Sequence, residues 1–142
     1  MAAQIALAAG DIAVLIRAED CTATALLDAH GYVFVCAENL GAMSGPMKDM
    51  FDRCYYDLVG QIEGRPYATA IAAGSAGQGA ETQIDRIVAG WRLRRVAESL
   101  IVNLRAQTAE AIAARKVLLL EESIQCHTLG MAFAEGLKLG IY

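Results

Sequence analysis

Two glycine-bearing segments hold the residues best suited to ligand chemistry in this chain. Each follows an apolar run: residues 36–46 follow Tyr32–Val35, and Gly74–Gly79 follow Tyr67–Ala73. In open α/β sheets, ligands bind outside the carboxyl ends of the strands, where such strand-to-helix loops lie. Glycines in these loops let the backbone approach a bound molecule closely. The pattern therefore predicts a ligand site formed by these two segments.

Other kinds of catalytic centre find little support in the sequence. The cysteines Cys21, Cys36, Cys54 and Cys126 form no Cys-x-x-Cys pair, and no histidine is spaced to complete a zinc site. No Ser/His/Asp or Cys/His arrangement for nucleophilic catalysis is present, because Cys126 and His127 are neighbours on a predicted helix and point in different directions. We expect reduced, structural thiols and no metal site.

The composition predicts one cytoplasmic domain over residues 1–142. A hydrophobic share of 56% against 20% charged residues excludes intrinsic disorder. The net charge of −4 leaves no broad basic face, so nucleic acid is not an expected partner. Apolar runs such as Ile12–Ile16 fall far short of the roughly 20 residues that a membrane span needs. The N-terminus lacks the order of a secretion signal, which agrees with a cytoplasmic location.

Strand-like and helix-like segments alternate along the chain. Continuous apolar runs predict buried parallel strands at Ile12–Ile16, Tyr32–Val35, Tyr67–Ala73 and Ser99–Leu104. Apolar residues at helical spacing predict helices over Ala2–Ala9, Thr22–Asp28, Met47–Leu58, Ile84–Trp91 and Leu118–Leu137. Ser44 is the predicted N-cap of the third of these helices. The alternation predicts an α/β fold in three layers, an open and mostly parallel sheet with helices on both faces.

Part of the chain resembles a known family. An apolar strand leads into a loop ending Met43-Ser44-Gly45, and a helix follows with Lys48, Phe51, Asp52 and Arg53. From Leu27 to about Val102 this order resembles the flavodoxin-like NAD(P)H-dependent oxidoreductases, which include FMN reductases and quinone reductases. The later run from Gly74 to Thr82 is similar to the second flavin loop of that family.

The resemblance implies FMN as the cofactor and NAD(P)H as the electron donor. FMN would lie across the strand ends, with its ring on the first loop and facing the second. The implied cofactor-binding residues are Ala37, Glu38, Asn39, Leu40, Gly41, Ala42, Met43 and Ser44 in the first loop, and Gly74, Ser75, Gly77, Gln78 and Gly79 in the second. The resemblance assigns no catalytic side chain, because the chemistry belongs to the flavin.

The chain departs from the family pattern in two places. Ala37-Glu38-Asn39-Leu40 stands where the family has Pro-Thr and an aromatic residue or arginine, and a carboxylate at Glu38 would oppose the anionic form of a reduced flavin. The first strand of the family and its phosphate-binding loop have no counterpart before Ala2. We therefore expect an N-terminally shortened flavodoxin-like domain whose first central strand, between Ile12–Ile16 and Tyr32–Val35, is missing. We also expect FMN to bind weakly or not at all.

Three functional hypotheses follow. The leading one is an FMN-dependent oxidoreductase that passes hydride from NAD(P)H through the flavin to a quinone or similar small acceptor, as a homodimer or higher homo-oligomer. The second is a non-catalytic flavodoxin-like remnant that acts through dimerisation, and the missing phosphate loop favours it. The third is a flavin-binding electron carrier, which the modest net charge of −4 disfavours.

Overall fold

The computed structural model describes all 142 residues and is built around one five-stranded sheet. Its strand order is β2-β1-β3-β4, and β5 pairs with β3 beyond the end of β4. All pairings are parallel except the short antiparallel one between β1 and β2. The strands span Tyr32–Asn39 (β1), Ala42–Met43 (β2), Pro66–Ala73 (β3), Arg94–Arg95 (β4) and Leu100–Asn103 (β5). The predicted strands at residues 32–35, 67–73 and 99–104 are thus confirmed.

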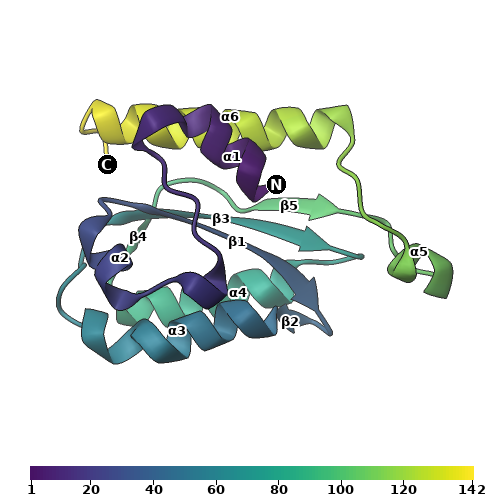
Figure 1. Cartoon of the computed structure of the whole chain (residues 1–142), viewed down its shortest axis with the longest axis horizontal. Coiled ribbons are helices and arrows are strands. Elements are labelled where there is room, and N and C mark those ends of the chain that lie inside the picture. The colour runs from purple at the N-terminus through teal and green to yellow at the C-terminus, as the bar shows by residue number, and fades with distance from the viewer.

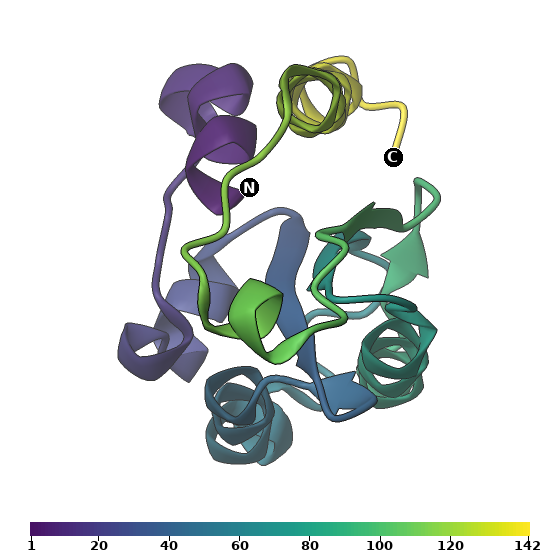
Figure 2. The same cartoon turned by 90° about the vertical axis from the view of Figure 1, so that its right-hand side faces the viewer.

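Helices cover both faces of the sheet, as predicted (Figure 1). One face carries α3 (Gly45–Leu58) and α4 (Gln78–Gly90), and the other carries α1 (Ala2–Ala9) and α6 (Leu120–Lys138). The remaining helical segments are short: α2 (Ala23–Asp28), α5 (Ala109–Ala113) and the 3₁₀ turns η1 (Gly10–Ile12) and η2 (Ala18–Asp20). The layers are clearest end-on in Figure 2. None of the helices combines the length and the apolar character that crossing a membrane requires.

The larger core lies between the sheet and the α3/α4 layer. Trp91, Phe51 and Ile84 are each at most 1% exposed, and the ring centroids of Trp91 and Phe51 lie 5.3 Å apart. The indole N–H of Trp91 donates to the carbonyl of Tyr55 at 3.0 Å, so the one polar group of that ring is satisfied. This core holds the C-terminal turns of α3 and α4 against β1 and β3.

The smaller core lies beneath α1 and α6 and depends on a close helix contact. Ile5 of α1 packs with Ala70 of β3 and Cys126 of α6. At Gly130 of α6 a Cβ atom would overlap the backbone carbonyl of Ile5. Only glycine at this position therefore lets the two helices approach as closely as they do.

Replacing Gly130 by alanine is expected to destabilise the protein by about 1–2 kcal/mol, because overpacking against backbone atoms costs about 2–3 kcal/mol and the higher helix propensity of alanine returns about 1 kcal/mol. The clash is with backbone atoms of Ile5, so the helices must separate, and this cost exceeds the roughly 1 kcal/mol that alanine gains over glycine in a helix. Urea unfolding measures the change. Thr128→Ala, at an exposed position of the same helix, is the control. A Gly130→Ala protein as stable as wild type would contradict the close packing.

The predicted strand at Ile12–Ile16 is wrong. Ile12 ends η1, and the residues after it are extended but belong to no strand. Val14, Leu15 and Ile16 are 81%, 56% and 39% exposed, and their backbone groups make no hydrogen bond. In Figure 2 this purple segment runs along the outside of the molecule from α1 to η2. An apolar run forms a buried strand only where a neighbouring strand pairs with it, and here none does.

The edge of β1 that faces away from β3 is also unpaired along most of its length. β3 pairs with residues 32–37 of β1, whereas on the other edge β2 pairs only with Glu38 and Asn39. No strand lies beside this outer edge of Tyr32–Cys36. This arrangement agrees with the expectation of a flavodoxin-like sheet without its first central strand.

Candidate functional site

The first predicted ligand segment is a β-hairpin rather than an open loop. β1 runs to Asn39, and the chain reverses through Leu40 and Gly41, which have positive φ angles of 54° and 74°. Two positive φ angles are what a tight two-residue hairpin turn requires. Leu40 at the tip is fully exposed. Ser44 takes the predicted N-cap position of α3, but its side chain makes no capping hydrogen bond.

The second predicted segment is closely packed against the chain itself. Gly74, Ser75 and Ala76 turn the chain out of β3, Gly77 has a positive φ of 98°, and Gln78 and Gly79 already belong to α4. A Cβ at Gly77 would overlap the side chain of Ile101, and one at Gly79 would overlap the carbonyl oxygen of Gly41. The space next to these two glycines is therefore filled by other residues of the protein and is not open to a ligand.

Glu38 joins the two segments. Its carboxylate, at the end of β1, accepts hydrogen bonds from the backbone N–H groups of Gly77 and Ala80, both at 2.9 Å. These donors lie at the start of α4, where N–H groups have no partner inside the helix and the helix dipole favours a negative charge. The N-cap residue Gly77 has no side chain to satisfy them, so Glu38 caps the helix from a different segment. The hydrogen bonds from Ala80 and Gly77 hold the pKa of Glu38 below its usual value.

A second contact supports the same arrangement. The side-chain oxygen of Gln83, one turn into α4, accepts the backbone N–H of Met43 at 2.9 Å. Met43 is 5% exposed and packs into the α3/α4 core. Together with Glu38 and the close approach of Gly79 to Gly41, this bond holds the hairpin on the first turn of α4.

Acid is expected to remove the stabilising effect of Glu38. Because its pKa is lowered in the folded protein, the ionised carboxyl adds stability above its unfolded pKa of about 4.3. That contribution is lost as the pH falls through the lowered folded-state pKa. Wild type should therefore be more stable than Glu38→Gln at neutral pH, with the difference shrinking below about pH 4. Urea unfolding of both proteins across this range is the measurement, and a difference independent of pH would contradict the capping role.

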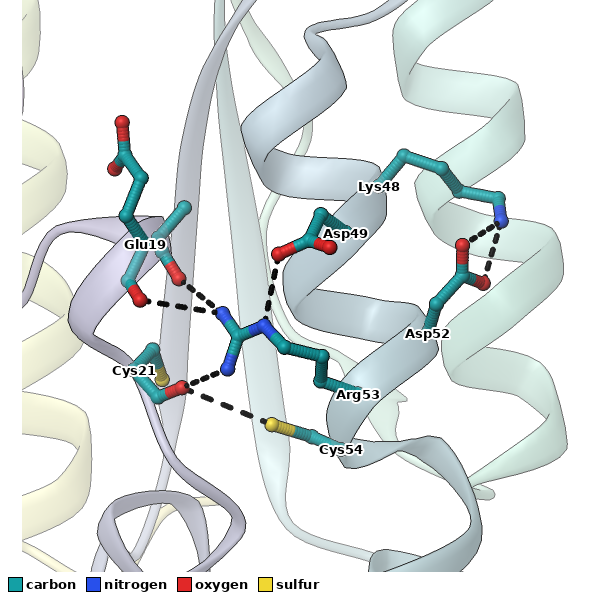
Figure 3. Close-up of polar contacts among 8 residues, drawn as sticks. Glu19, Cys21, Lys48, Asp49, Asp52, Arg53 and Cys54 are labelled. Atoms are coloured by element: carbon teal, nitrogen blue, oxygen red, sulfur yellow. Dashed lines mark hydrogen bonds and ion pairs between the residues drawn. The ribbon is translucent and has the colours of Figure 1, made fainter.

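The α3 residues that carry the family resemblance make contacts within the protein (Figure 3). Lys48 pairs with Asp52 one turn along α3, and Arg53 pairs with Asp49 at 2.8 Å. The guanidinium of Arg53 also donates to the carbonyls of Ala18 and Cys21, both at 2.8 Å. Arg53 thereby ties η2 to α3, whereas Phe51 lies in the core.

An apolar cavity of about 310 Å³ opens at the carboxyl ends of the strands. Its lining comes from β1, β3, the residue after β5, the start of the chain and the segment before α6: Met1, Val35, Cys36, Ala72, Leu104, Lys116, Val117 and Leu118. Cys36 is the first residue of the segment predicted at residues 36–46, and Ala72 lies two residues before the second predicted segment. Burial raises the pKa of the Cys36 thiol, so it stays neutral at neutral pH. None of the predicted cofactor-binding residues lines this cavity, and nothing in the sequence pattern indicates that residues 104 and 116–118 come together in its wall.

The other hollow of note is polar and lies elsewhere. Its lining residues are Glu81, Asp85, Arg95, Glu98 and Ser99, with a volume of about 470 Å³. Arg95 forms ion pairs with Glu81 and Asp85 and lies over the Tyr67 ring. This hollow has no apolar wall for a flat ring. No cluster of histidine, cysteine and acidic side chains in the structure can hold a metal ion.

The apolar cavity fits the ring of the expected flavin better than it fits the phosphate of FMN. Its volume reaches the lower end of small-molecule sites, roughly 300–1,000 Å³, and its walls are apolar as an aromatic ring requires. Lys116 is the one side chain in the lining that carries a charge, and its ammonium is bonded to the carbonyls of Ala111, Ile112 and Ala114. The one other feature of the lining that would favour a phosphate is Met1, because it lies at the N-terminal end of α1, where the helix dipole is positive.

Comparison with known proteins agrees with this geometry. A family model described as NADPH-dependent FMN reductase matches residues 21–106. That range contains β1, the hairpin, α3, β3, α4, β4 and β5. A comparison with curated proteins finds no match.

Solved structures support the fold. A flavodoxin from the domain Archaea is 15% identical, with a TM-score of 0.69, over 96% of this chain and 87% of that one. A mutant flavodoxin from Pseudomonas aeruginosa is 15% identical, with a TM-score of 0.65, over 97% of this chain and 91% of that one. A structure described as an NADPH-quinone reductase from P. pentosaceus is 11% identical, with a TM-score of 0.56, over 79% and 71%. At these identities the likeness concerns the fold.

Proposed function

Because this chain belongs to the NADPH-dependent FMN reductase family, and so to the flavin-dependent oxidoreductases, we propose that it transfers hydride from NAD(P)H through FMN to a small acceptor such as a quinone. The observation that carries the proposal is the apolar cavity at the carboxyl ends of β1 and β3. Ligands of open α/β sheets bind at this edge. The family match covers β1 and β3, which supply Val35, Cys36 and Ala72 of the lining, but not Met1 or residues 116–118.

The side chains around the cavity would bind and orient the flavin. Val35, Ala72 and Leu104 offer apolar surface to a flat ring, and Val117 and Leu118 cover it from the segment before α6. This lining excludes water from the buried part of the ring. FMN, when bound, would supply the hydride-transfer chemistry between the nicotinamide and the acceptor. The side chains of this protein would only need to bind and orient it. The two predicted segments continue the chain from Cys36 and Ala72 of this lining, and we propose that they contact the edge of the ring.

Titration with FMN and with riboflavin tests binding and its phosphate dependence. The missing phosphate loop predicts weak binding or none, but the apolar cavity leads us to expect that FMN binds with one molecule per chain, quenching its fluorescence. We also expect riboflavin to bind within about tenfold of FMN, because the cavity lining serves the ring and offers few free charges to the phosphate. No saturable binding of either flavin would overturn the proposal.

A second candidate is a non-catalytic member of the fold. The outer edge of β1 is unpaired, and the backbone donors at the start of α4 are used by Glu38 rather than left for a ligand. Both observations favour a protein that keeps the sheet but does not use a flavin. The same titration separates the two candidates, because only the oxidoreductase binds FMN.

Assembly and location are also part of the proposal. We propose a homodimer or higher homo-oligomer, supported by Leu120, Ile124 and Met131, exposed apolar residues of α6. A cytoplasmic location is supported by four free, buried cysteines, which suit a reducing compartment. Sedimentation analysis of the wild type tests the first point, and a purely monomeric protein at micromolar concentration would contradict it.

A further inference from the structure

The contacts of Glu38 extend the proposed function to a residue outside the cavity. We propose that Glu38 is a positioning residue, whose carboxylate holds the 39–43 hairpin on the start of α4 and so keeps the edge of the flavin site in its binding shape. This inference rests on the proposed function. Glu38 has this role although it stands where the resembling family has other residue types.

Glu38 connects two segments that are far apart in the sequence. Glu38 is the last residue but one of β1, whereas the N–H groups that its carboxylate accepts, those of Gly77 and Ala80, follow β3. A local cap would fix only α4, but a cap supplied by the neighbouring strand fixes the distance between the two strand ends as well. Bonds between a carboxylate and backbone N–H groups are stronger than neutral ones.

Besides the packing of Met43 in the core, few polar contacts join the hairpin to α4. Gln83 supplies one neutral bond to Met43, and Gly79 and Gly41 touch without a side chain between them. The turn residue Leu40 is fully exposed and therefore adds no buried contact. Without Glu38, the hairpin tip would therefore keep one polar tether and lose the charged one.

The residues held by Glu38 follow closely in the chain on two residues of the cavity wall. Cys36, which lines the cavity, lies two residues before Glu38 on the same strand, and Ala72 lies five residues before Gly77. A loosened hairpin and α4 start would leave both cavity walls less well placed. If only a fraction of molecules then has the binding shape, the apparent affinity falls by that fraction.

The experiment compares FMN binding by wild type, Glu38→Ala and Glu38→Gln, with Glu63→Gln as the matched control. Glu63 is an exposed acid that precedes β3 and pairs with Arg92. It lies at the end of the sheet opposite to Glu38. We expect Glu38→Ala to weaken FMN binding about tenfold or more, as for a binding shape populated in one molecule in ten. Glu38→Gln should fall between, because its amide keeps one acceptor oxygen. Glu63→Gln should bind as wild type.

Two further measurements separate positioning from a general loss of stability. Amide hydrogen exchange of the flavin-free proteins should speed up at Gly77 and Ala80 in Glu38→Ala and not in Glu63→Gln. With saturating FMN, the visible circular dichroism of the bound flavin should change in Glu38→Ala, because it reports the surroundings of the ring.

The outcomes are distinguishable. Tight FMN binding by wild type and equally tight binding by Glu38→Ala would overturn this inference and leave the proposed function standing. Unchanged exchange at Gly77 and Ala80 would also overturn it. If wild type itself binds no FMN, the proposed function fails and the inference fails with it.

Discussion

Replacing Ala72 by tryptophan is expected to weaken flavin binding by roughly tenfold to a hundredfold. Ala72 lies on β3 in the wall of the apolar cavity, and an indole in its place would occupy the space proposed for the ring. Forcing a ligand into that filled space costs about 1–3 kcal/mol, which weakens binding by roughly tenfold to a hundredfold. Fluorescence titration with FMN measures the effect. The expectation is specific to the cavity, since the hairpin and the start of α4 keep their contacts in this variant.

The matched control is Ala89→Trp, at an exposed position near the C-terminal end of α4. It adds the same side chain far from the cavity and should leave FMN binding unchanged. Circular dichroism and thermal unfolding show whether both variants keep the fold. An Ala72→Trp protein that is folded and binds FMN as wild type does would place the flavin ring outside this cavity.

The second large effect is on stability. Trp91→Ala is expected to lower the free energy of unfolding by about 3–5 kcal/mol, the usual cost of removing a buried large aromatic residue. Trp91 is 0% exposed, and its ring lies 5.3 Å from that of Phe51 and 5.7 Å from that of Tyr55. Its loss leaves a cavity between α3 and α4 and an unpaired carbonyl at Tyr55.

Tyr56→Ala is the control for this prediction. Tyr56 neighbours Tyr55 on α3 and is 85% exposed, so removing its ring should change stability by only about 0.5 kcal/mol. Urea unfolding of the variants gives the free energies. A loss below about 1 kcal/mol for Trp91→Ala would contradict the packing of α3 against α4 in this structure.

Much of the fold follows from patterns visible in the sequence. The apolar runs at residues 32–35 and 67–73 predict buried parallel strands because both faces of the sheet are covered by helices. Apolar spacing around Phe51, Ile84 and Phe133 predicts α3, α4 and α6 because one side of each helix packs on the sheet or on another helix. These features depend on residues near one another in the chain.

The strand predicted at Ile12–Ile16 shows the limit of such patterns. Its residues have the apolar character of a buried strand, but a strand also needs a hydrogen-bonding neighbour, and that neighbour is a property of the whole sheet. The outer edge of β1 and this segment remain separate, each without a partner strand. Composition alone does not reveal which apolar runs find partners.

The location of the candidate site could be predicted from the sequence, whereas its long-range contacts could not. Its place at the strand ends follows from the alternation of strands and helices, and both predicted segments lie at that edge. The cap from Glu38 to Gly77 and Ala80 joins residues about forty positions apart, which no local pattern indicates. Leu104, Lys116 and Leu118 enter the cavity wall because the chain crosses the strand ends between β5 and α6.

The most direct test of the central claim is anaerobic reduction of the FMN-loaded protein. The wild type is loaded with FMN, freed of excess flavin, and mixed with NADPH or NADH without oxygen while the visible absorbance of the flavin is followed. We expect the bound flavin to be bleached faster than free FMN under the same conditions, and its colour to return when a quinone is added. A protein that retains no FMN, or one whose bound flavin keeps its absorbance with both nucleotides, would contradict a flavin-dependent oxidoreductase.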